Sequence, residues 1–98
     1  MSNFSMTNNA HSVTAKYYVA DEGEIMRLPS TYSSIEDAAR HVHKLLNNKY
    51  VITSPLRKTV TRNMQVNSER VTLTNYAGEV TRNNLTRRVY VTIASKHV

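Results

Sequence analysis

One segment of this chain carries its apolar residues at helical spacing, and this segment constrains the fold more than any other feature. The residues in question fall at i, i+3, i+4, i+7, i+10 and i+11, which places them on one stripe of an α-helix: Ile35, Ala38, Ala39, Val42, Leu45 and Leu46. Ser33 followed by Glu36 matches a capping box, and Asn47-Asn48 is a typical C-terminal stop. We therefore expect one amphipathic helix with a single buried face.

On both sides of this helix, apolar residues alternate with polar ones, as in strands with one buried face. The pattern predicts strands over residues 13–19 and 24–28 before the helix, and over 50–54, 58–66, 70–76 and 85–94 after it. Turns are expected at 20–23, 67–69 and 82–84. The predicted fold is α+β and two-layer, with one helix packed on a mostly antiparallel sheet in the order ββα followed by βββ or ββββ.

The length of 98 residues fits a single domain. Residues 1–12 are polar and have no regular apolar spacing, so they lack the apolar surface that offsets the entropy of ordering. We expect a disordered tail over residues 1–12 and one α+β domain over residues 13–98.

The alternation also predicts which side chains face the helix. In the last strand, Leu85, Val89, Val91 and Ile93 share one face, and Thr86, Arg88, Tyr90 and Thr92 share the other. In the strand before it, we expect Val71 and Leu73 to face the core and Arg70, Thr72, Thr74 and Tyr76 to face away. If the helix covers the apolar face of the sheet, the opposite face stays open.

Charge is divided unevenly along the chain, whose net charge is +6. Residues 1–40 hold three basic and five acidic residues, 3 − 5 = −2, whereas residues 41–98 hold ten basic and two acidic residues, 10 − 2 = +8. Clustered Lys and Arg attract polyanions, so the C-terminal part favours an acidic partner such as a nucleic acid.

The candidate binding residues combine basic and aromatic side chains. On the predicted open face we place Arg70, Tyr76, Arg88 and Tyr90, with Lys16 and Tyr18 on the first strand; a second basic edge around Pro55 holds Arg57, Lys58 and Arg62 together with Arg82 and Arg87. Basic groups neutralise phosphates, and exposed aromatic rings stack on unpaired bases. This pattern predicts sequence-tolerant binding of DNA or RNA. The same residue types also stabilise any antiparallel sheet and protect its edge strands, and this alternative stays open.

Several classes of function are excluded or disfavoured by composition. The chain has no cysteine, and its glycines and prolines number two each, so thiolate metal sites, disulfides and Gly-rich phosphate loops are absent from the sequence. His41 and His43 lie about 200° apart around a helix, which does not suit one shared metal. No serine or threonine occurs in a nucleophile-elbow context. We expect a protein with no catalytic site, no metal and no cofactor.

The remaining expectations concern location and partners. No apolar run approaches the roughly 20 residues of a membrane span, and the N-terminus does not resemble a signal peptide. We expect a cytoplasmic protein, of a cell or of an infected host, that is a monomer or a homodimer. The alternative function is a protein-interaction module or inhibitor, for example of phage type, that docks on an acidic partner or homodimerises through its sheet.

Overall fold

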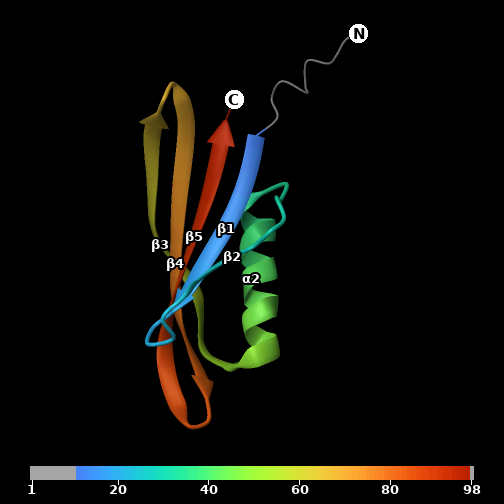
Figure 1. Ribbon diagram of the computed structural model, residues 1–98, viewed down its shortest axis with the longest axis vertical. Helices are drawn as coiled ribbons and strands as arrows, with labels where there is room; N and C mark the ends of the chain where they lie inside the picture. Colours follow the sequence, from blue (N-terminus) through green and yellow to red (C-terminus); the bar gives the residue numbers. More distant parts are fainter. Residues whose placement is uncertain (1–10, 98) are drawn as a thin grey trace.

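The computed structural model describes residues 11–97. In chain order these form β1 (His11–Val19), β2 (Ile25–Arg27), α2 (Ile35–Lys49), β3 (Val51–Val66), β4 (Glu69–Arg82) and β5 (Leu85–His97). The strands form one antiparallel sheet in the order β2-β1-β5-β4-β3, and α2 runs along one face of it (Figure 1). The predicted α+β class, with one helix and an antiparallel sheet, is confirmed. The predicted N-terminal tail lies outside the described residues except for 11 and 12, which belong to β1.

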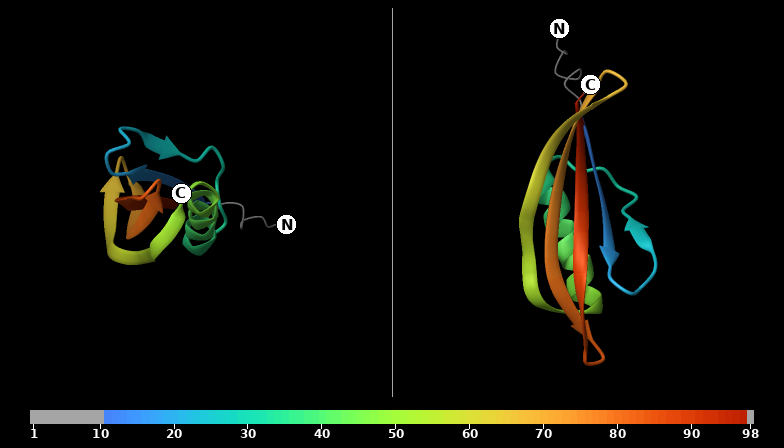
Figure 2. Two further views of the ribbon diagram at one scale, coloured as in Figure 1. Left: turned by 90° about the horizontal axis from the view of Figure 1, so that it is seen from below. Right: turned by 90° about the vertical axis from the view of Figure 1, so that its left-hand side faces the viewer.

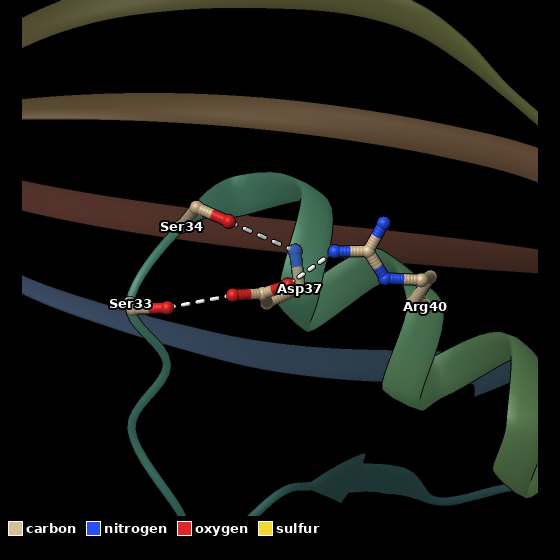
Figure 3. Close-up of polar contacts among 4 residues, drawn as sticks. All are labelled: Ser33, Ser34, Asp37 and Arg40. Atoms are coloured by element: carbon tan, nitrogen blue, oxygen red, sulfur yellow. Dashed lines mark hydrogen bonds and ion pairs between the residues drawn. The ribbon is translucent and has the colours of Figure 1, made fainter.

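The helix begins one residue later than the predicted capping box. Ser34 is the N-cap, because its Oγ accepts a hydrogen bond of 3.0 Å from the backbone N–H of Asp37 (Figure 3). Ser33 Oγ donates to the Asp37 carboxylate at 2.6 Å, and Arg40 forms an ion pair with the same carboxylate. These hydrogen bonds from Ser33 and Arg40 lower the pKa of Asp37. At the other end α2 continues past Asn47-Asn48 and is capped by Tyr50.

The hydrophobic core lies between α2 and the two strands beneath it. The helix contributes Ala38, Val42 and Leu46, each fully buried. Alternate residues of two neighbouring strands pack against them: Val13, Ala15, Tyr17 and Val19 from β1, and Val89, Val91 and Ile93 from β5. The predicted stripe of the helix therefore faces the sheet.

Two tight turns connect the last three strands. Asn67 and Ser68 join β3 to β4 with φ of 50° and 70°, and Asn83 and Asn84 join β4 to β5 with φ of 54° and 63°. Positive φ at both central residues matches the right-handed twist of a two-residue hairpin. Both turns lie where the sequence predicts them.

The third strand is continuous where the sequence suggested two strands, over 50–54 and 58–66. β3 spans Val51–Val66, and its pairing with β4 shifts register between Ile52 and Ser54, between Ser54 and Arg57, and between Lys58 and Val60. Each shift changes the phase of the alternation, which explains why the pattern looked interrupted around Pro55. The shorter of the two predicted orders, ββαβββ, describes the elements observed.

The face prediction for β4 is wrong. The two-residue turn aligns Arg82 with Leu85, which places Thr74 opposite Ile93 and Tyr76 opposite Val91. Even-numbered residues of β4 therefore share the helix-covered face with Ile93 and Val91, and Thr74 is only 2% exposed. Val71 and Leu73, which we expected to face α2, lie on the opposite face, where Val71 is nevertheless only 8% exposed, because a change of one residue in register reverses every side chain of a strand.

Candidate nucleic-acid interface

The face of the sheet opposite α2 is covered by no helix of the described part of the chain. The right panel of Figure 2 looks onto this face, with α2 behind the sheet. We call it the open face; its side chains come from even positions of β1 and β5 and from odd positions of β4, as the strand register requires.

A pair of tyrosines lies near the middle of the open face. Tyr18 on β1 is directly opposite Tyr90 on β5, and 45% of the Tyr90 surface is exposed. The guanidinium carbon of Arg88 lies 5.9 Å from the centre of the Tyr90 ring, which is a cation–π distance. Lys16 lies two residues from Tyr18 along β1. The structure therefore brings together Lys16, Tyr18, Arg88 and Tyr90, as the sequence predicts.

Basic residues flank the tyrosine pair on the open face, toward both edges of the sheet. Arg27 on β2 lies opposite Lys16. On β3, Arg57 lies opposite Ala77 and Arg62 lies opposite Leu73, so both arginines belong to the open face and both are exposed. The centre between these flanks, at Ala77, Asn75 and Thr92, is uncharged. The open face thus presents tyrosine rings near its centre and basic side chains near its two edge strands.

A groove of about 390 Å³ lies on the open face where β2 ends. Lys16 and Arg27 lie on its rim, Leu73 and Ala94 contribute apolar surface, and Thr14 and Thr92 add hydroxyl groups. The Thr92 hydroxyl donates a 2.9 Å hydrogen bond to the side-chain carbonyl of Asn75. The groove thus combines basic, apolar and hydrogen-bonding groups.

Four of the predicted binding residues lie on the helix-covered side: Arg70 and Tyr76, which we expected on the open face, and Lys58 and Arg87, which we expected at the basic edge. Tyr76 packs against the core, and this burial raises its pKa. Lys58 lies opposite Tyr76, and Arg70 lies opposite Gln65 near the β3–β4 turn. The predicted grouping of Arg70 and Tyr76 with Arg88 and Tyr90 is therefore wrong, for the reason of register given above.

The fourth of these residues, Arg87, takes part in a cluster around Glu22. Tyr50 Oη donates a 2.7 Å hydrogen bond to Glu22 Oε1, and Arg82 Nη2 donates to Glu22 Oε2 at 3.2 Å. Arg87 Nη1 lies 3.9 Å from the same oxygen, and the Arg82 guanidinium carbon lies 4.8 Å from the centre of the Tyr50 ring. Burial is the largest cause that raises the pKa of Tyr50, and the hydrogen bond to Glu22 is the second. Arg82 and Arg87 therefore both lie within ion-pair distance of Glu22.

Sequence reasoning missed Arg27 and Lys96. The hairpin around Gly23, which has φ of 84°, places Arg27 opposite Lys16, and this register would have revealed it. Lys96 is the next residue on the open face after Tyr90, Thr92 and Ala94, because β5 extends beyond the predicted end at Ala94.

The comparisons with known proteins add no identification: no family model, no curated protein and no solved structure matches this chain. Within residues 11–97, no three His, Cys, Asp or Glu residues gather as metal ligands. In the same range, no helix is long and apolar enough to cross a membrane.

Proposed function

We propose that this protein is a small, non-enzymatic accessory protein that binds single-stranded DNA or RNA, with little sequence preference, through its open face. The observation that carries the proposal is the Tyr18–Tyr90 pair, aligned across two strands and accompanied by Arg88 and Lys16. We further propose that it acts in the cytoplasm of a cell or of an infected host.

The chemistry of the open face supports this function. Every base has a π-face, so stacking on Tyr18 and Tyr90 tolerates any sequence. The exposed basic side chains at the margins, Arg27, Arg57 and Arg62, suit phosphates on either side of the stacked bases. A duplex presents its bases edge-on within the grooves, so this face favours unpaired strands.

A second candidate is docking on an acidic protein partner through the same face. Its support is the exposed apolar surface of Ile25 and Val60, which are 53% and 44% exposed. Apolar anchors with a basic rim are typical of such interfaces. A homodimer that stacked two open faces would bring Lys16, Arg27, Arg57 and Arg62 of both copies together, and this repulsion disfavours it.

The test is fluorescence anisotropy with labelled oligonucleotides of about 12 nucleotides, single-stranded and duplex, at about 50 and about 200 mM salt. We expect single strands to bind more tightly than duplexes. With about four phosphate contacts, log affinity should fall against log salt with a slope near −3. Binding of an acidic protein without any binding of oligonucleotide would support the second candidate instead.

Arg88→Ala and Arg70→Ala form a matched pair, because both arginines are exposed but only Arg88 lies on the open face. We expect Arg88→Ala to weaken single-strand binding several-fold more than Arg70→Ala. The double variant Tyr18→Ala/Tyr90→Ala should weaken it by roughly ten-fold or more, through lost stacking. Unchanged affinity of the tyrosine double variant would rule out the open face as the site.

A further inference from the structure

The groove on the open face continues the surface of the tyrosine pair. Lys16 lies two residues from Tyr18 on β1, and Thr92, its partner across the strands, lies two residues from Tyr90 on β5. Two residues along a strand span about 7 Å. A strand of nucleic acid that stacks on the tyrosines therefore reaches the groove with an adjacent part of its chain.

The groove itself has a basic side and an apolar side. Lys16 and Arg27 lie directly opposite each other on β1 and β2 and both line the groove, so two cationic side chains border it on this side. Leu73 and Ala94 are directly opposite each other on β4 and β5, and both are half-buried. An anionic group fits the first pair and a flat apolar group fits the second.

The remaining lining groups suit the polar edge of a base. Thr92 donates its hydroxyl hydrogen to Asn75, so its oxygen lone pairs stay available as acceptors. Thr14 is exposed on the same lining and offers both a donor and an acceptor. The volume of about 390 Å³ lies near the lower limit for small-molecule sites, which suits one nucleotide and not a base pair.

We propose that this groove holds one unstacked base of the bound single strand over Leu73 and Ala94, with the adjoining phosphate on the Lys16–Arg27 pair. This inference rests on the proposed function, and it adds a nucleotide subsite beside the tyrosine pair. Stacking on Tyr18 and Tyr90 alone does not require it.

Ala94→Leu fills the groove without changing any charge. We expect it to weaken binding of a labelled 12-nucleotide single strand by roughly ten-fold, the order of one lost base contact, with an unchanged salt slope. Ala39→Leu is the matched control, because Ala39 is half-buried on α2, on the other side of the sheet from the groove, and should leave the affinity within about two-fold. Lys16→Gln and Arg27→Gln should each reduce the magnitude of the salt slope by about 0.7.

Amide chemical shifts of the unaltered protein provide the second measurement, which decides the question if Ala94→Leu does not fold. Thymidine monophosphate and the 12-nucleotide strand should each shift the amides of Leu73, Thr92 and Ala94, whereas inorganic phosphate alone should not. If the groove amides stay unshifted while Tyr18→Ala/Tyr90→Ala abolishes oligonucleotide binding, the subsite is refuted and the proposed function stands. If no oligonucleotide binds at low salt, both fail.

Discussion

At Gly78 the chain tolerates no side chain, because the irregular part of β3 passes directly over it. A Cβ atom there would lie 2.7 Å from the carbonyl oxygen of Ser54 and 3.2 Å from Leu56 Cδ2. The shorter of these distances is below any normal contact, and its partner is backbone, which has no rotamer to change. The register shifts of β3 and this glycine therefore form one structural unit.

We expect Gly78→Ala to lower the free energy of unfolding by about 2 kcal/mol, through overpacking against the Ser54 carbonyl. Urea denaturation measures this. The loss should persist when Leu56→Ala is added, because the closest atom belongs to the backbone and not to the leucine. A double variant that regains the stability of Leu56→Ala alone would show that the side chain was the obstacle.

At the scale of elements, the start of α2 separates two adjacent serines with different roles. Ser34 accepts the hydrogen bond from the Asp37 backbone, whereas Ser33 only donates to the exposed Asp37 side chain. We expect Ser34→Ala to lower the free energy of unfolding by about 1 kcal/mol and Ser33→Ala by less than about half of that. Thermal or urea unfolding of the two variants measures both losses. A larger loss for Ser33→Ala would indicate that Ser33 is the N-cap, as the predicted capping box requires.

The elements themselves were predictable, because each carries a local signal. The stripe from Ile35 to Leu46 predicts α2, and Asn83-Asn84 predicts the last turn. The face of β4 was mispredicted because its two sides are almost equally apolar, with Leu73 and Ala77 on one side and Tyr76 and Val80 on the other. Only the two-residue turn, which pairs Arg82 with Leu85, decides between them.

The candidate site was predictable to the same extent. Arg88 and Tyr90 were placed correctly because the alternation of β5 is unambiguous, with Val89, Val91 and Ile93 all fully buried. Arg70 and Tyr76 were placed on the wrong face because they lie on β4, whose face was mispredicted. The engagement of Arg87 by Glu22 depends on residues 65 positions apart, which no local pattern reveals.

At the scale of the whole molecule, the Glu22 cluster ties together three distant parts of the chain. Glu22 follows β1, Tyr50 follows α2, and Arg82 and Arg87 flank the last turn. Tyr50 is only 8% exposed, and the Glu22 carboxylate is the partner that accepts the hydrogen bond from its hydroxyl. The cluster therefore closes the end of the sheet where α2 terminates.

This cluster predicts a loss of stability in alkali. The pKa of Tyr50 is raised in the folded protein above its usual value of 10.0, so deprotonation of Tyr50 destabilises the fold. The contribution of Tyr50 to the free energy of unfolding is therefore complete below about pH 10 and is lost as pH rises through the folded-state pKa. Urea denaturation of Tyr50→Phe at several pH values should show a smaller alkaline loss than the unaltered protein. Some loss should remain, since burial also raises the pKa of Tyr32 and Tyr76. Identical alkaline losses in both proteins would contradict this role.

The strand order also has a consequence for how the protein is made. β5 is the last strand in the described chain but occupies the centre of the sheet, between β1 and β4. During synthesis, β1 and α2 leave the ribosome well before their shared neighbour exists, so their apolar faces remain exposed until β5 follows. The hairpin of β3 and β4 can form in the meantime through its own turn. Completion of the sheet is thus a late event that joins two separately prepared halves.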